Sequence, residues 1–171
     1  MKDQAAEALA PGAIRLVTAS MSPEEAARLR AGGLDAQGTG PELAVSDGSA
    51  DPCRCRLTDI AGGRAMLIFA HRPWARTDPY AETGPIFLCA EPRAPRRPDA
   101  LLGALPEARG ERAQAPANAC LENDIRYGRG RVCAPSEVEG DRRGLPAAPR
   151  NACLHIRSAT NACRQFRVER G

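Results

Sequence analysis

Aromatic residues, histidine and lysine are all scarce in this sequence. Aromatic residues make up 4% of the 171 positions, there are two histidines, and arginine supplies all but one of the basic residues. Proteins that bind nucleic acid by stacking need aromatic side chains interleaved with basic ones. The net charge is only +3, and a GC-rich coding bias produces arginine richness by itself. The composition therefore argues against nucleic acid as a partner.

Long apolar runs are also missing. The longest, AMLIFA and PIFLCA, are far shorter than a membrane span, and the first twelve residues contain no apolar block of signal-peptide length. We therefore expect a soluble, cytoplasmic protein that does not contact the membrane. The length predicts an N-terminal tail over residues 1–12 and a single domain over residues 13–171, since roughly 100–200 residues per domain is usual.

Cysteine is the reactive residue type that the sequence does contain, with seven copies. An odd number leaves at least one thiol unpaired, and without a secretion signal a disulfide framework is not expected. The sequence therefore predicts reduced thiols.

One helix is predicted clearly, over about residues 22–31. Ser22 is placed as the N-cap, Pro23 takes the first helical position, and Glu25 completes a capping box. The glycines at 32–33 stop the helix.

The rest of the pattern favours short strands. A hairpin is predicted from an alternating strand that begins at Cys53, a turn at DIAGG, and an apolar strand, AMLIFAH, buried on both faces. Further strands are predicted at three other places: GPIFLCA, NDIRYGRGRVCA with a glycine bulge, and a closing hairpin of ACLHIRS and CRQFRVER. We expect an α+β fold with a mainly antiparallel sheet and a few short helices.

The closing hairpin carries the densest group of reactive side chains. Alternation along its first strand puts Cys153, His155 and Arg157 on one face. If the register brings Cys163 and Gln165 beside that face, a thiol, an imidazole, a guanidinium and an amide converge, which suits a carboxylate or phosphate ligand.

A structural role for the same residues stays open. In that interpretation Cys153 is a small buried residue, His155 makes a structural hydrogen bond, and Arg157 pairs with an acid such as Glu82 or Glu169.

The CRC segment raises a second chemistry. In an extended strand Cys53 and Cys55 share one face, with Arg54 on the other. Structural zinc sites usually space their cysteines two to four apart, and the sequence contains no second pair with that spacing. Cys89 and Cys163 could complete a set of four thiols. A catalytic thiolate, which requires a lowered pKa, and a simple strand role remain as alternatives.

The proline-rich segment RPWARTDPYAETGPIF is predicted as a loop. Its Trp74, Tyr80 and Glu82 suit a pocket rim, and the alternative is that Trp74 only caps the core. YGRG matches neither the dinucleotide fingerprint nor the P-loop. No motif indicates a nucleotide, flavin or haem cofactor.

Four blocks carry a family resemblance: PCRCRL, AHRPW with PYAETGPIFLCAEP, IRYGRGRV, and LHIRSATNACRQFRVER. Over roughly residues 22–170 they resemble the DUF1203 family of uncharacterised bacterial proteins. Ten residues match the family pattern, namely Cys53, Pro79, Tyr80, Glu82, Gly84, Pro85, His155, Arg157, Ser158 and Cys163. The resemblance implies no function.

Departures from the family pattern concern its cysteines and histidines. Arg56, Arg93 and Phe166 replace family cysteines, whereas Cys55 and Cys89 replace family histidines. If relatives bind a metal there, a zinc site of four thiolates remains available, made of Cys53, Cys55, Cys89 and Cys163. Loss of three thiols is equally consistent with a decayed site.

The sequence thus predicts a pocket for a small anionic ligand. Its candidate catalytic residues are His155 and Cys163, and its candidate ligand-binding residues are Tyr80, Glu82, Arg157 and Ser158. The alternatives are a metal- or redox-linked cysteine protein and a non-catalytic interaction module. Whether a reaction is catalysed, which ligand binds and which oligomer forms are not defined by the sequence.

Overall fold

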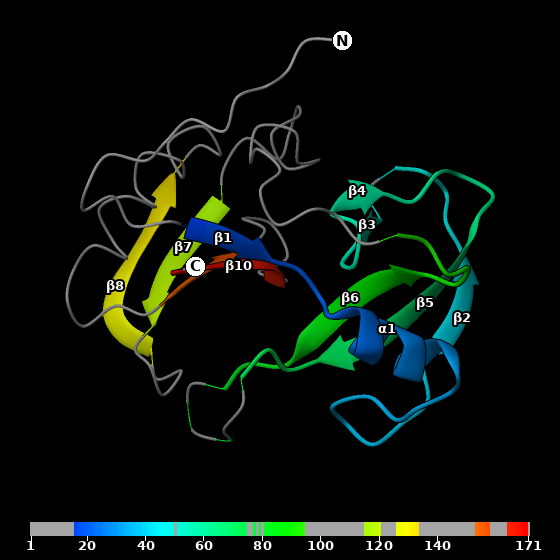
Figure 1. The fold of residues 1–171 in the computed structure, drawn as a ribbon, viewed down its shortest axis with the longest axis horizontal. Helices are drawn as coiled ribbons and strands as arrows, with labels where there is room; N and C mark the ends of the chain where they lie inside the picture. Colours follow the sequence, from blue (N-terminus) through cyan, green and yellow to red (C-terminus); the bar gives the residue numbers. More distant parts are fainter. Residues whose placement is uncertain are drawn as a thin grey trace, which may run out of the picture.

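The computed structural model describes residues 16–49, 51–74, 77, 79, 81–94, 115–120, 126–133, 153–157 and 164–170. These residues form two five-stranded sheets and one short helix (Figure 1). Sheet A contains, in spatial order, β1 (Leu16–Ala19), β10 (Arg164–Arg170), β9 (Cys153–Arg157), β7 (Ala115–Cys120) and β8 (Arg126–Cys133). Sheet B contains β2 (Glu42–Val45), β5 (Ala65–His71), β6 (Gly84–Cys89), β3 (Pro52–Cys53) and β4 (Thr58–Asp59).

Sheet A is antiparallel at every strand pair. The predicted closing hairpin is confirmed as β9 and β10. The predicted glycine bulge is also present, because the β7–β8 register shifts between Asn118 and Cys120 and the extra residues of β8 include Gly128.

The register of the closing hairpin pairs His155 with Arg167, and a register shift lies between Arg164 and Phe166. Cys163 lies outside the described residues, so its predicted convergence with Gln165 beside this face stays a prediction. A bulge of this kind changes which residues are neighbours, and hydrophobic alternation does not show where it lies.

Sheet B is antiparallel except at its β3–β6 contact. There Cys53 pairs with Phe87 in parallel, and the N–H of Arg54 donates to the Phe87 carbonyl at 2.9 Å. The β5–β6 hairpin holds the centre of this sheet, from Met66 opposite Cys89 to His71 opposite Gly84.

The helix α1 (Pro23–Arg30) confirms the predicted one. The Ser22 hydroxyl accepts the N–H of Glu25 at 3.1 Å, and Gly32 takes a positive φ of 83° after the last turn. The helix lies over β5 and β6 (Figure 1). An ion pair of 3.4 Å between Glu25 and His71 ties its first turn to the end of β5.

The predicted strand at CRC is wrong, because β3 ends at Cys53 and the next four residues form a turn. The N–H of Leu57 donates to the Cys53 carbonyl at 2.7 Å, and Leu57 adopts a positive φ of 54°. This turn makes β3 and β4 a tight hairpin, so the strand before DIAGG pairs with β3 and not with β5.

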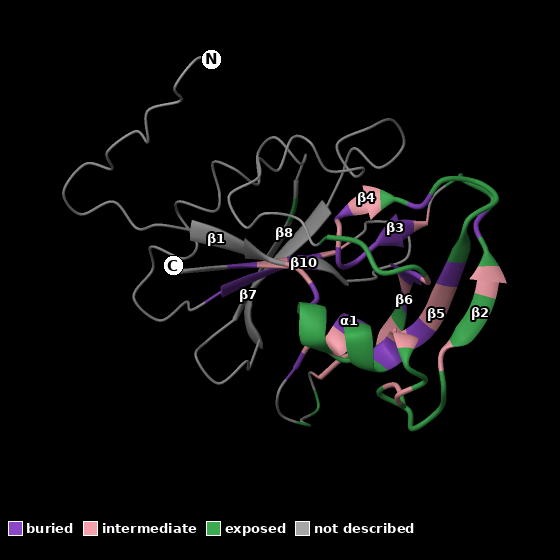
Figure 2. Cartoon of the chain, turned by 45° about the vertical axis from the view of Figure 1, so that its right-hand side comes forward, coloured by how far each residue is buried: buried purple, intermediate pink, exposed green. Residues whose placement is uncertain are grey.

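The main hydrophobic core lies between α1 and sheet B. Ala26 and Leu29 of the helix are buried with Phe69, Ile86 and Leu88 of the two central strands. Figure 2 shows buried residues along β5 and an exposed outer face of α1. Burial of β5 on both faces holds only in part, since Leu67 and Ile68 are half-buried.

The fold is therefore mostly strand. The sequence predicts a few short helices, whereas the described residues contain one. No helix of the described residues is long and apolar enough to cross a membrane.

Candidate functional site

Three free cysteines converge at one end of sheet B. Cys53 ends β3, Cys55 lies in the following turn, and Cys89 ends β6. All three belong to the hydrophobic core, with exposed fractions of 0%, 1% and 9%. We call them the thiol cluster.

A hydrogen bond from the main chain to sulfur joins the cluster. The N–H of Cys89 donates to Sγ of Cys53 at 3.3 Å. In a regular parallel ladder this N–H would seek a carbonyl of β3, but the Arg54 carbonyl instead accepts the N–H of Met21 at 3.1 Å. The early end of β3 thus leaves a backbone donor that the sulfur of Cys53 satisfies.

The contact between the two cysteines shifts their pKa values in opposite directions. The neighbouring Cys89 side chain is the largest of the effects that lower the pKa of Cys53 to about 5. Burial raises this pKa, and the N–H groups of Cys89, Arg56 and Cys55 lower it further. The pKa of Cys89 is raised, first by the neighbouring Cys53 side chain and then by burial. Cys53 is therefore the more acidic thiol of the pair.

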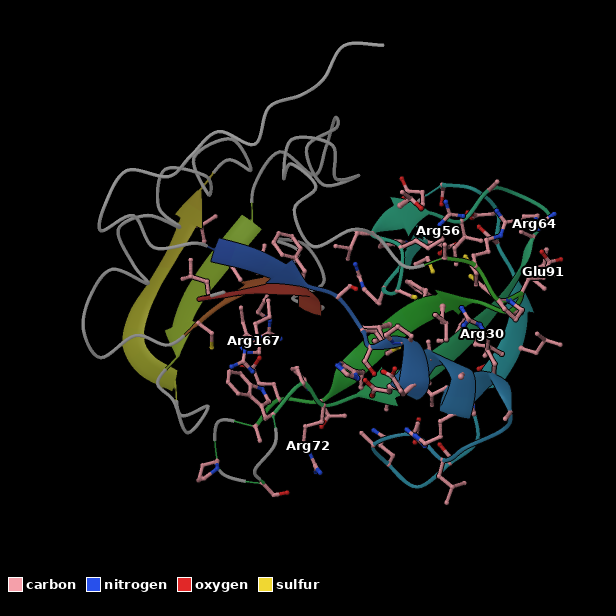
Figure 3. All side chains as sticks on the ribbon, viewed as in Figure 1. Arg30, Arg56, Arg64, Arg72, Glu91 and Arg167 are labelled. Carbon is pink, nitrogen blue, oxygen red and sulfur yellow. The ribbon has the colours of Figure 1, made fainter. Side chains whose placement is uncertain are left out.

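Arg30 of α1 connects the helix to the cluster. Its Nε donates to the Cys89 carbonyl at 3.0 Å, and Figure 3 shows the side chain beside sheet B. Burial raises the pKa of Cys55, followed by the charge of Cys53, while Arg30 opposes both. Cys55 is thus the thiol that burial keeps protonated.

A cavity of about 270 Å³ opens beside Cys89. Arg56, Arg64 and Arg93 line it together with Asp59 and Glu91. Figure 3 shows Arg56, Arg64 and Glu91 gathered at this end of sheet B. Cys89 is the member of the thiol cluster that reaches the cavity wall.

The arginines of the cavity differ in their partners. Arg64 forms an ion pair with Glu91, and Nη2 of Arg93 lies 3.6 Å from Oε2 of the same carboxylate. Arg56 has no ion pair with any residue that the structure describes. Positive charge that carboxylates do not neutralise therefore lies next to Cys89.

A metal site is not visible in the described part of the chain. No group of three or more His, Cys, Asp or Glu side chains there is arranged to hold a metal ion. The predicted zinc set includes Cys163, which lies outside the described residues. That site stays a prediction.

The second group of reactive side chains joins sheet A to the β5–β6 loop. The rings of Trp74 and His155 stack with their centroids 4.2 Å apart and their planes at 19°. Arg157 forms an ion pair with Glu82, as the structural interpretation predicted. The imidazole and the ion pair thus make contacts that hold the loop on the sheet. Trp74 is 6% exposed and packs in a second small core with Cys153.

One prediction about this second group, that its cysteine is reduced, is wrong. Cys153 is disulfide-bonded, to a cysteine whose side chain is not described, so the prediction of reduced thiols is wrong there. Cys153 is buried on a sheet, and the spacing of cysteines in the sequence does not show which of them the fold brings close enough for a disulfide.

Tyr80, Ser158 and Cys163 lie outside the described residues, so an anion site containing them stays a prediction.

Sequence reasoning missed the arginine-lined cavity. Its arginines come from three separate places: Arg56 lies in the β3–β4 turn, Arg64 directly precedes β5, and Arg93 comes after β6. The available signal was the pair Arg56 and Arg93, at which the family resemblance led us to expect cysteines and which the structure places on the same cavity.

Comparisons with known proteins give a family and no further relative. The profile of the family described as "Protein of unknown function (DUF1203)" matches residues 50–170, which include the thiol cluster and sheet A beyond β1. No curated protein and no solved structure matches the chain.

Proposed function

The chain belongs to the DUF1203 family of proteins of unknown function, and we propose that it carries out reversible thiol–disulfide chemistry at Cys53 and Cys89. One observation carries this proposal. Two free cysteines from different strands are in contact, with the N–H of Cys89 donating to Sγ of Cys53 at 3.3 Å, and Cys89 lines an arginine-rich cavity.

The geometry gives each thiol a separate task. Cys89 is the thiol that a small molecule in the cavity meets first, while Cys53 is fully buried behind it. Attack on a disulfide needs a thiolate, so Cys89 reacts after losing its proton to water. Arg93 and Arg56 favour the charge that then develops on Cys89.

The reaction balances with a small-molecule disulfide as the oxidant. The Cys89 thiolate forms a mixed disulfide and releases one thiolate, which takes up a proton from water in place of the one that Cys89 lost. The Cys53 thiolate then attacks Sγ of Cys89, forms the protein disulfide and releases the second thiolate, which also takes a proton from water. Two electrons pass from the two cysteines to the small disulfide, which becomes two thiols.

Equilibration in buffers of graded redox potential tests the proposal. We expect wild-type protein to lose two titratable thiols as the buffer becomes more oxidising, with a single reversible midpoint. Cys53→Ser and Cys89→Ser should each abolish that transition, whereas the matched control Cys55→Ser should keep it. A wild-type thiol count that stays constant at every potential would refute the function.

Zinc binding by the same thiols is the competing function, and elemental analysis distinguishes it. Protein purified without chelator should carry no stoichiometric zinc if the cysteines act as a redox pair. Stoichiometric zinc that Cys53→Ser releases would instead support the four-thiolate site with Cys55, Cys89 and Cys163.

A further inference from the structure

We propose that the cavity beside Cys89 selects a small anionic disulfide, one that carries carboxylate groups, as the oxidant of the thiol pair. This inference rests on the proposed thiol chemistry and adds the class of substrate. It follows from the position, the size and the charge of the cavity.

The position of the cavity makes Cys89 the point of attack. Cys89 contributes to the cavity wall, whereas Cys53 and Cys55 are absent from the residues that line it. A disulfide that occupies the cavity therefore meets one thiol, and Sγ of Cys53 lies next to it, 3.3 Å from the main-chain nitrogen of Cys89. This order suits a mixed disulfide on Cys89 followed by its resolution by Cys53.

The size of the cavity limits the oxidant to a small molecule. Its volume of about 270 Å³ lies just below the roughly 300–1,000 Å³ of pockets that enclose drug-sized ligands. A peptide or protein disulfide would have to stay largely outside. The cavity therefore fits one arm of a small disulfide better than a macromolecular partner.

The charge of the cavity favours an anion. Three arginines face two carboxylates there, and one of those carboxylates, Glu91, already contacts both Arg64 and Arg93. Arg56 is left without an ion-pair partner among the described residues and lies in the turn that follows Cys53. A guanidinium binds a carboxylate by two parallel hydrogen bonds, so Arg56 is the residue best placed to hold the carboxylate.

In the reaction the anion stays bound while the sulfur bond changes. One arm of the disulfide becomes attached to Sγ of Cys89, and the other leaves as a thiolate that takes a proton from water. Attack by Cys53 then releases the bound arm. Two protein thiols are oxidised and one disulfide is reduced to two carboxylate-bearing thiols.

Oxidation rates with three small disulfides test the inference on the full chain. The probes are dithiodiglycolate, which is anionic, hydroxyethyl disulfide, which is neutral, and cystamine, which is cationic. We expect dithiodiglycolate to oxidise the pair about tenfold faster than the neutral probe at low ionic strength, with cystamine slowest. Salt should reduce the difference, because exposed arginines are screened.

Substitutions of residues that line the cavity test which of them select the anionic disulfide. Arg56→Ala should remove the preference for dithiodiglycolate. It should also slow the reaction with hydroxyethyl disulfide, but by a smaller factor, because Arg56 favours the charge on Cys89 with either probe. Glu91→Gln should increase the preference, because it releases Arg64 and Arg93 for the ligand. Arg72→Ala is the matched control, since Arg72 is exposed and lies away from the cavity (Figure 3).

The outcomes separate this inference from the proposed function. If all three probes oxidise Cys53 and Cys89 at the same rate, the dithiol function stands and the anionic substrate is refuted. If Arg72→Ala changes the preference as much as Arg56→Ala, a general charge effect replaces the cavity site. If no probe forms the disulfide, the proposed function itself fails.

Discussion

The two regions that bury reactive side chains differ in how those side chains are partnered. In the region around sheet A, Arg157 pairs with Glu82, His155 stacks on Trp74, and Cys153 is in a disulfide. In the thiol cluster of sheet B, Cys53 and Cys89 are free, and the N–H of Cys89 donates to Sγ of Cys53 beside a cavity.

The comparison teaches that residue type alone does not identify a reactive site. The richest group of reactive residues in the sequence, around His155, holds a loop on a sheet. The short segment CRC contributes Cys53, the thiol whose pKa is lowered to about 5. Access and incomplete pairing, rather than the presence of histidine or arginine, distinguish the two regions.

The largest expected effect concerns the loop contact of sheet A. Trp74→Ala removes a buried indole that packs on His155 and Cys153, and should lower the free energy of unfolding by about 3 kcal/mol. Urea unfolding measures this loss, with Trp74→Phe as the milder control. While the variant is folded, oxidation of Cys53 and Cys89 should be unchanged. A large change in that oxidation would show that the two regions are coupled.

A smaller effect is expected from the ion pair between the loop and sheet A. Arg157→Ala leaves the partly buried Glu82 carboxylate without its ion-pair partner, and should cost about 1–2 kcal/mol. The double variant Arg157→Ala with Glu82→Gln should recover part of that loss, because no charge is left unpaired. If stability is unaffected but an anion no longer binds, the region is a ligand site after all.

The third effect is the pH dependence of stability due to the thiol pair, which is small over any single pH unit. Between pH about 5 and 9.0 the unfolded thiol of Cys53 binds a proton that the folded one does not, so stability should rise with pH. Above that range the folded Cys89 keeps its proton while the unfolded one loses it, so stability should fall. One proton limits either slope to about 1.4 kcal/mol per pH unit.

Unfolding curves across this pH range check the prediction. Cys53→Ser should lose the rise that wild type shows, and Cys55→Ser should keep it because burial raises the pKa of Cys55. Parallel curves for wild type and Cys53→Ser would mean that Cys53 is not a thiolate in the folded protein.

Local signals were sufficient to predict part of the fold. Ser22, Pro23 and Gly32 define the ends of α1 within one or two residues of the prediction, because capping acts within a single turn. The strands β6, β8 and the β9–β10 hairpin are also confirmed. Each combines an extended pattern with nearby turn residues.

The turn after Cys53 was not predictable from local pattern. CRCR alternates like a strand, but Arg54 is only 4% exposed and its backbone bonds to Phe87 and Met21. These partners come from distant parts of the chain, so tertiary contacts override the local preference.

The candidate site was predictable only in its residue types. The sequence singled out Cys53, Cys55 and Cys89, together with Cys163, but could not place Cys53 next to Cys89, because β4 and β5 separate β3 from β6 along the chain. Arg30 and Arg56 were missed for the same reason. Their positions depend on how α1 and the turn pack on sheet B.

Peptide mapping of the oxidised protein tests the central claim most directly. Trypsin cleaves after Arg54 and so separates Cys53 from Cys55, while Cys89 lies in the peptide of residues 77–93. We predict that mild oxidation by a small disulfide links the peptide containing Cys53 to residues 77–93, and that reduction releases both. A disulfide that uses Cys55 instead, or a digest in which Cys53 and Cys89 stay free, would contradict the account.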